Sequence, residues 1–198
     1  GVRASPELVL LALDDADLVS VGVAGDPATR GRRPDEAFPV LQPLLAGETV
    51  DHHGEFYDAP EAAVLPAPAP PVPITVGGRS DAAVRRAGLR GDGWLASWCS
   101  PRRFAAGVAL AEATAAEAGR TGVFWQHGYQ IWVGLGDTPA EGAALLGPAM
   151  ERFYGAPYSA FERYSPVGTP AQIADWLRPY VDAGAVDFNI AQIGRAHV

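Results

Sequence analysis

The sequence of 198 residues contains no lysine, since all fifteen residues counted as Lys or Arg are arginine. Schiff-base catalysis and the phosphate-binding lysine of P-loop NTPases both need an ε-amine, so neither chemistry can come from this chain. The single cysteine, Cys99, allows no internal disulfide, and the four histidines lack the Cys/His spacing of a structural zinc site. We therefore expect a fold that is stabilised neither by disulfide bonds nor by a structural metal ion.

Long apolar runs are also missing. No run approaches the ~20 residues that cross a bilayer, and Gly1–Pro6 lacks the basic and apolar parts of a signal peptide. With a net charge of −8, the chain lacks the basic surface that tracks phosphates, so we expect neither a membrane nor a nucleic acid as partner and a cytoplasmic location. A hydrophobic fraction of 48% is typical of a globular protein that can bury a core.

Helix starts are the clearest local signals. Three segments place a Ser or Thr N-cap directly before a proline at the first helical position. Glu141 and Gln172 stand three residues after Thr138 and Thr169, which predicts a capping box at two of these starts. Together with Ser80 as a fourth cap, and with Gly91, Gly119, Gly155 and Gly184 as stops, the pattern predicts helices over 81–90, 101–118, 139–154 and 170–183.

Short apolar runs between these helices predict strands that are covered on both faces, which is typical of a parallel sheet. The runs are Leu18–Ala24, Pro73–Val76, Gly93–Ser97, Val123–Val133 and Val186–Ile190. Strict alternation of strand and helix implies right-handed crossovers with ligand sites at the carboxyl ends of the strands, in an open sheet or in a barrel.

Two segments fit this alternation less simply. Asp35–Ala46 should be a helix by its position, but Pro39 and Pro43 predict a kinked or partly 3₁₀ helix. Glu48–Pro73 is a long connection, which we expect to be functional or to contain a hairpin, and to end in an extended polyproline-like stretch over Pro66–Pro73.

The segment Pro73–Trp94 (PITVGGRSDAAVRRAGLRGDGW) resembles the bacterial-luciferase-like superfamily of flavin- and F420-dependent oxidoreductases. Further segments agree in order: Val21–Glu36, Glu48–Tyr57, Gly119-Arg120, Asp137–Glu141 and Val167–Phe188. The resemblance implies an α/β fold in which residues 1–191 form a partial (β/α)₈ TIM barrel covering roughly strands four to eight. Residues 192–198 (QIGRAHV) resemble a translated sequencing adapter, and we expect them to carry no structure.

The same resemblance implies function. The full-length parent would use reduced FMN or coenzyme F420 to oxidise or hydroxylate a small organic substrate, either after activating O₂ or by hydride exchange, and could be a homodimer. The catalytic acid and base of many relatives belong to early strands that have no counterpart here, so the chain alone is expected to be inactive. A non-catalytic flavin-binding relative, or an open flavodoxin-like domain that binds another phosphorylated ligand, stays open as an alternative.

The turn Gly77-Gly78-Arg79-Ser80 is the main candidate for cofactor binding. Two glycines let the backbone approach an anion, Arg79 adds a positive charge, and the N-terminus of the following helix favours negative charge. From the residues alone, a plain strand–helix turn with a capped helix is the alternative. The resemblance implies that the phosphate of the cofactor binds at this turn.

Other strand ends supply further candidates. Gly22, with Ala24 and Gly25, is small enough for a flat ring to lie against the backbone, or else serves close helix packing. Trp94 and Trp98 flank the predicted strand Gly93–Ser97. Either is a candidate for the wall of the cofactor pocket and could equally belong to the core.

His127 and Tyr129 are the candidates for catalysis. They lie two residues apart on one predicted strand and share a face, whereas Gln130 faces the other way. The pair could reach a substrate, with the histidine as proton donor, or it could be hydrogen-bonded core. We expect no metal at Asp51–Glu55 (DHHGE), because adjacent histidines rarely chelate one ion, and we expect Cys99 to be a small buried filler.

Overall fold

The computed structural model describes residues 10–11, 29 and 31–193. The described residues fall into two compact units, one with Leu10 and the residues from 29 to 74 and one with Leu11 and the residues from 75 to 193, and each unit is considered separately. The predicted strand Leu18–Ala24, with the candidate Gly22 and its neighbours Ala24 and Gly25, lies outside the described residues.

The first unit contains a helix and a hairpin. Helix α2 (Arg32–Leu45) is followed by the antiparallel strands β2 (Val50–His53) and β3 (Asp58–Ala62), which confirms the hairpin expected in the long connection. Of the two forms predicted for this helix, kinked or partly 3₁₀, the partly 3₁₀ form is wrong, because α2 continues as an α-helix through both prolines. The kink stays a prediction. Pro39 and Pro43 are four residues apart, so the two missing N–H donors lie on one side of the helix.

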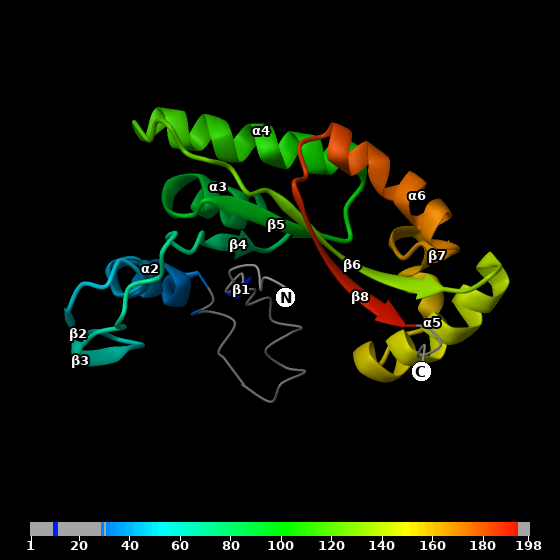
Figure 1. The fold of residues 1–198 in the computed structure, drawn as a ribbon, viewed down its shortest axis with the longest axis horizontal. Coiled ribbons are helices and arrows are strands. Elements are labelled where there is room, and N and C mark those ends of the chain that lie inside the picture. The colour runs from blue at the N-terminus through cyan, green and yellow to red at the C-terminus, as the bar shows by residue number, and fades with distance from the viewer. Residues whose placement is uncertain (1–9, 12–28, 30, 194–198) are drawn as a thin grey trace. The chain divides into compact units, whose positions relative to one another are not determined.

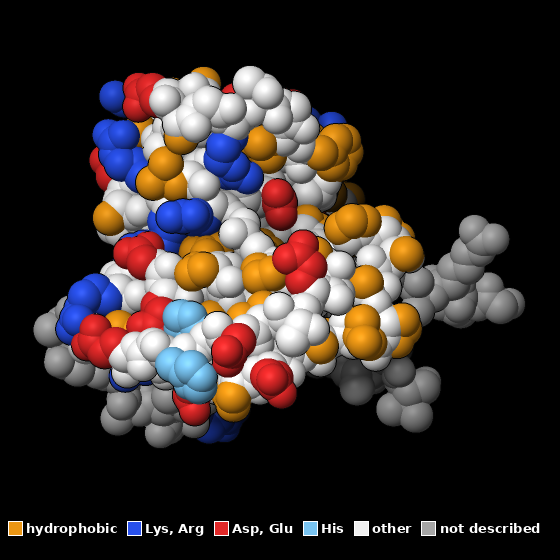
Figure 2. Space-filling model, turned by 90° about the vertical axis from the view of Figure 1, so that its left-hand side faces the viewer, with side chains coloured by type: hydrophobic (Ala, Val, Ile, Leu, Met, Phe, Trp, Pro, Cys, Tyr) orange, Lys and Arg blue, Asp and Glu red, His pale blue; other side chains and the backbone are white. Residues whose placement is uncertain are grey.

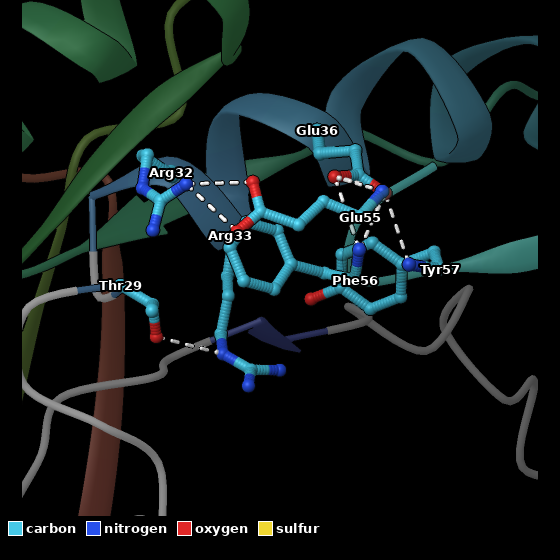
Figure 3. A network of polar contacts seen from close by, with 7 residues as sticks. All are labelled: Thr29, Arg32, Arg33, Glu36, Glu55, Phe56 and Tyr57. Carbon is cyan, nitrogen blue, oxygen red and sulfur yellow. Dashed lines mark hydrogen bonds and ion pairs between the residues drawn. The ribbon is translucent and has the colours of Figure 1, made fainter. Parts of the chain in front are cut away.

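Glu36 ties this helix to the hairpin (Figure 3). Its carboxylate accepts backbone N–H groups from Glu55 at 3.1 Å, Phe56 at 3.0 Å and Tyr57 at 2.9 Å, all in the turn of the hairpin. Arg32 forms an ion pair with Glu55 at 2.6 Å at the exposed rim of the same network. The hairpin turn is thus held by one carboxylate that satisfies three backbone donors.

The second unit is built on a parallel sheet (Figure 1). Within the described residues the sheet has six strands in the order β1-β4-β5-β6-β7, and β8 pairs with β6. Strand β6 is the centre, because β8 follows it along its whole length while β5 and β7 pair with its beginning and its end. The strands are β1 (Leu10–Leu11), β4 (Thr75–Gly77), β5 (Gly93–Ser97), β6 (Gly128–Leu135), β7 (Val167–Gly168) and β8 (Asp187–Ile193).

The four predicted helices are confirmed to within one residue as α3 (Asp81–Arg90), α4 (Pro101–Glu117), α5 (Pro139–Tyr154) and α6 (Pro170–Asp182). All four predicted N-cap hydroxyls accept a backbone N–H three residues further on. The capping box is complete at Thr169 and Gln172. At α5 it is not, because the Glu141 carboxylate accepts the N–H of Asp137 at 3.0 Å instead.

Helices contact both faces of this sheet. Trp94 stacks on Phe104 of α4 with ring centroids 5.6 Å apart, and Tyr129 stacks on Tyr180 of α6 at 4.2 Å. Trp132, on the other face of β6, contacts Phe153 at the end of α5 at 5.3 Å. We call the face covered by α4 and α6 the outer face and the face toward α5 the inner face; Figure 1 shows the helices on these two sides.

Two further findings concern expectations from the sequence. None of the helices in the described part of the chain is long and apolar enough to cross a membrane. Gln192 and Ile193 belong to β8 and pair with Val133 and Gly134. The first two residues of the adapter-like segment 192–198 are therefore part of a strand, contrary to expectation.

Candidate functional site

The diglycine turn lies at the carboxyl end of β4. Gly77 ends the strand, and Gly78 has φ 127°, a left-handed conformation that favours glycine. A Cβ on Gly78 would also lie 2.7 Å from the Cβ of Ala83, so space and backbone both require glycine there. Arg79 and Ser80 are exposed and the two glycines are half-buried. The turn is therefore open at the start of a ten-residue helix, where backbone N–H groups can meet an anion.

Trp94 supports this turn from beneath. Its side chain is 1% exposed on the outer face, and its indole N–H donates to the carbonyl of Gly78 at 2.7 Å. Its place in the core, against Phe104, favours the core alternative over a direct contact with a cofactor. Arg103 fixes the turn from the side, since it donates to the carbonyl of Arg79 at 3.1 Å and to the carboxylate of Asp81 at 2.7 Å.

Trp98, the second tryptophan considered for the pocket wall, directly follows the neighbouring strand β5. Its backbone has φ 45°, which is uncommon for a bulky residue. The guanidinium of Arg79 lies 5.7 Å from the centre of its ring, and the ring also contacts Tyr154 and Phe161 at 5.0 and 5.1 Å. Trp98 thus joins the diglycine turn to the segment that follows α5.

Cys99, the next residue, is buried as expected, and burial raises the pKa of its thiol to about 11. At neutral pH it is therefore a protonated thiol, which is a poor nucleophile. The backbone carbonyl of Cys99 accepts hydrogen bonds from the hydroxyls of Tyr180 at 2.7 Å and Tyr129 at 3.1 Å.

A row of polar side chains crosses the inner face from the carboxyl end of β5 to the first halves of β6 and β8. Ser97 of β5 is in register with Gln130 of β6, and Gln130 is in register with Asn189 of β8. Side chains in lateral register on parallel strands point to the same face, and these alternate with the outer-face residues Ala96 and Tyr129. Sequence reasoning missed Ser97 and Asn189 because only the strand register brings them beside Gln130.

His127 lies in the core, on the side of the outer face. Its Nδ1 accepts the backbone N–H of Trp94 at 3.1 Å, and its ring stacks on Trp125 at 5.0 Å. The side chain is 2% exposed, and burial lowers its pKa to about 4. The imidazole is therefore neutral at pH 7 with its proton on Nε2. This atom has no hydrogen-bond partner among the described residues, and Oε1 of Glu112 lies 3.7 Å from it.

Tyr129 shares this outer face, as predicted, and is fully buried between α4 and α6. Burial raises the pKa of its hydroxyl, which donates to the carbonyl of Cys99. The pair that we named for catalysis is directed away from the inner face, and the geometry favours the core alternative. Gln130, which we placed on the opposite face, is the β6 side chain beside Ser97 and Asn189.

The histidines of the hairpin are bound to carboxylates. His52 Nε2 lies 3.1 Å from Glu36, and His53 lies between Asp58 at 2.5 Å and Asp51 at 3.3 Å. The hydrogen bond to Asp58 raises the pKa of His53. Burial would raise the pKa of Glu36, but its hydrogen bonds from His52 and the hairpin backbone lower it.

The surface around these histidines carries mixed charge. Figure 2 shows histidine side chains at the surface beside acidic ones, with basic and acidic groups interspersed on that face. Among the residues that the structure describes, no three His, Cys, Asp or Glu side chains are arranged to hold a metal ion. In the DHHGE cluster, His52 pairs with Glu36 of α2, and His53 pairs with Asp51 and Asp58 of the hairpin.

Comparison with protein families identifies the chain. The family model of the luciferase-like monooxygenases matches residues 14–166. The chain belongs to this family. An uncharacterized protein of Mycobacterium tuberculosis is 42% identical over 100 residues, which cover 50% of this chain and 34% of that protein. An F420-dependent glucose-6-phosphate dehydrogenase of Beutenbergia cavernae is 33% identical over 95 residues, which cover 46% of this chain and 28% of the enzyme.

Solved structures give the same fold. An F420-dependent secondary alcohol dehydrogenase in complex with an F420–acetone adduct matches with a TM-score of 0.68 at 16% identity, over 89% of this chain and 60% of the enzyme. The F420-dependent tetrahydromethanopterin reductase of Methanopyrus kandleri matches with a TM-score of 0.64 at 19% identity, over 91% and 67%. The predicted partial TIM barrel is thereby confirmed, and the chain spans about a third of the curated relatives and about 60% of the alcohol dehydrogenase.

Proposed function

We propose that this chain is the part of an oxidoreductase that holds the phosphate of reduced FMN or F420, and that the complete enzyme oxidises or hydroxylates a small organic substrate. The observation that carries the proposal is the open turn Gly77–Ser80 at the carboxyl end of β4, in a chain of the luciferase-like family. F420-dependent relatives on both the sequence and the structure side support a deazaflavin or flavin ligand.

In this proposal the residues have distinct tasks. The N–H groups of the turn and the guanidinium of Arg79 bind the phosphate, while Trp94 and Arg103 hold the turn in shape. Ser97, Gln130 and Asn189 offer hydrogen bonds to the polar edge of a ring on the inner face. When bound, the reduced cofactor supplies the hydride or the oxygen-activating centre. Gly22 remains a prediction for the ring pocket.

Other expectations also remain proposals. No residue of this chain is assigned to proton transfer, because His127 and Tyr129 are buried on the outer face. The open flavodoxin-like alternative loses support, since the chain aligns with barrel enzymes over most of its length. A cytoplasmic location and a homodimeric parent remain predictions from the sequence.

Ligand titration tests the proposal. The purified chain is titrated with FMN and F420 and, in parallel, with riboflavin and the deazaflavin core that lacks a phosphate tail, while binding is followed by fluorescence. We expect the phosphate-bearing ligands to bind about tenfold or more tightly, because a charge-assisted contact at the turn contributes about 1.5–3 kcal/mol. Equal affinity for the two kinds of ligand would contradict the proposal.

A pair of glycine variants sharpens this test. Gly78→Ala introduces strain at φ 127° and a clash with Ala83, and should weaken binding of FMN by tenfold or more. Gly119→Ala introduces comparable strain at φ 73°, with nothing within 4 Å of the added Cβ and far from the turn in sequence. It should lower the melting temperature without changing affinity. An unchanged affinity of Gly78→Ala for FMN would mean that the turn serves packing and does not bind the phosphate.

A further inference from the structure

We propose that Trp98 is a positioning residue that holds the Arg79 guanidinium ready for the anionic group of the cofactor; the inference rests on the proposed function. Strands β4 and β5 are parallel neighbours with Gly77 in register with Leu95. Arg79 and Trp98 each follow one of these strands by one or two residues, so the two side chains meet above adjacent strand ends. The guanidinium carbon lies 5.7 Å from the centre of the Trp98 ring, within the range of a cation–π contact.

The charge of Arg79 is available to a ligand. None of the ion pairs among the described residues includes Arg79, and the carboxylate of nearby Asp81 is paired with Arg103 at 2.7 Å. The Arg79 carbonyl is occupied by Arg103 as well, so the backbone of the turn is fixed while the guanidinium is held by an uncharged ring. An aromatic face restrains a cation without neutralising it, which suits a group that has to bind an anion.

The conformation of Trp98 is the second, independent observation. A left-handed backbone at a bulky residue is costly and persists only where the surroundings hold it. Here the Cys99 N–H donates to the Tyr129 hydroxyl at 3.3 Å, and the Cys99 carbonyl accepts the hydroxyls of Tyr180 and Tyr129. This anchoring just after Trp98 fixes the point from which its ring projects.

The ring itself is also held in place. Tyr154 meets it edge-on with centroids 5.0 Å apart, and Phe161 contacts it at 5.1 Å. These contacts come from the end of α5 and the short 3₁₀ turns after it, which span 158–164. Because ordering a flexible arginine on binding costs side-chain entropy, a ring that orders it beforehand strengthens anion binding.

A double-mutant cycle tests the inference. Arg79→Gln, Trp98→Asn and the double variant are titrated with FMN and with riboflavin; asparagine is chosen because it tolerates a left-handed backbone. We expect Arg79→Gln to weaken FMN binding about tenfold and Trp98→Asn about three- to fivefold. The double variant should be no weaker than Arg79→Gln, because Trp98 acts through Arg79. Riboflavin affinity should not change.

Two further variants serve as controls. Trp98→Phe keeps an aromatic face and should retain affinity for FMN within about twofold. Arg85→Gln removes the same charge from an exposed position on α3 and should also stay within about twofold. If Trp98→Asn does not melt cooperatively, Phe161→Leu loosens the same ring and takes its place, with a smaller expected loss.

The outcomes separate the two proposals. Additive losses in the double variant, or an equal loss of riboflavin affinity in Trp98→Asn, would overturn the positioning role. A wild-type chain that prefers FMN to riboflavin, combined with unchanged affinity in Trp98→Asn, would leave the proposed function standing and remove only this inference. A wild-type chain with no preference for the phosphate would overturn the proposed function and the inference together.

Discussion

The two faces of the parallel sheet differ in what fills them. On the outer face, Trp94, Tyr129 and Ile131 are at most 1% exposed. Trp94 and Tyr129 stack on aromatic side chains of α4 and α6. On the inner face of the same strands, the corresponding positions include Ser97, Gln130 and Asn189, none of them buried.

This difference separates stability from binding. Burial of aromatic rings dominates core energetics, so a change on the outer face should be measured in unfolding. Polar side chains that remain accessible add little to stability and can form hydrogen bonds with a ligand. Substitutions on one face can therefore show whether the property assigned to the other face, stability or binding, also changes.

The largest effect is expected for Phe104→Ala. Phe104 is fully buried and contacts Trp94, Tyr129 and Tyr180, so its truncation leaves a cavity in the middle of the outer layer. Urea unfolding should show a loss of about 3–5 kcal/mol. Phe124→Ala is the control, since Phe124 is 83% exposed and its loss should stay within about 0.5 kcal/mol. Equal effects would mean that the outer layer is not the core.

The next effect is a loss of stability in acid, caused by His127. Burial lowers its pKa to about 4 in the folded chain, from about 6.5 when unfolded. The folded state therefore resists protonation, so this contribution to stability is complete above pH 6.5 and is lost as the pH falls toward 4. The loss is on the order of 3 kcal/mol, and urea unfolding between pH 7 and 4 should show it.

His127→Gln should flatten this part of the pH profile. His53 is the matched control because its pKa is raised by Asp58, so its contribution is present at low pH and disappears as the pH rises through the folded pKa. His53→Gln should therefore leave the loss of stability between pH 6.5 and 4 in place. If His127→Gln leaves the pH dependence of stability unchanged, the conclusion that the His127 imidazole is buried and neutral is wrong.

The smallest effect on stability is expected on the inner face. Gln130→Leu should change the melting temperature by less than about 2 °C and weaken binding of FMN and riboflavin alike, by about three- to tenfold. Ile131→Ala, one residue further and on the outer face, should lower stability by about 2 kcal/mol or more and leave the affinity unchanged. The reverse pattern would exchange the roles that we assign to the two faces.

The sequence was sufficient for features that depend on local chemistry. Hydroxyl caps, three of them before prolines, and stop glycines located four helices to within a residue, because they satisfy helix termini without help from the rest of the chain. The start of β6 was predicted at Val123 and lies at Gly128. Residues 123–127 are partly apolar, but a strand also needs neighbouring strands with which to pair, and composition does not show these.

The candidate site shows the same limit. The alternation of side chains along a strand correctly placed His127 and Tyr129 on one face of the sheet. It could not show which face, because both faces of a strand that is covered on both sides are apolar in sequence. The packing of Tyr129 on α6 shows that this is the outer face. Asn189 became a candidate only through its register with Gln130. The left-handed backbone of Trp98 has no sequence signal, because it is set by the tyrosines that hold Cys99.

Strand β8 has a consequence for handling the protein. It pairs along one side with β6, and no second strand accompanies it among the residues that the structure describes. Its other side then offers a row of amide and carbonyl groups to any extended peptide of suitable length, with Ile190 46% exposed nearby. We expect such an edge to pair with further copies of the chain, so purification at low concentration, or addition of a short complementary peptide, should keep the chain dispersed.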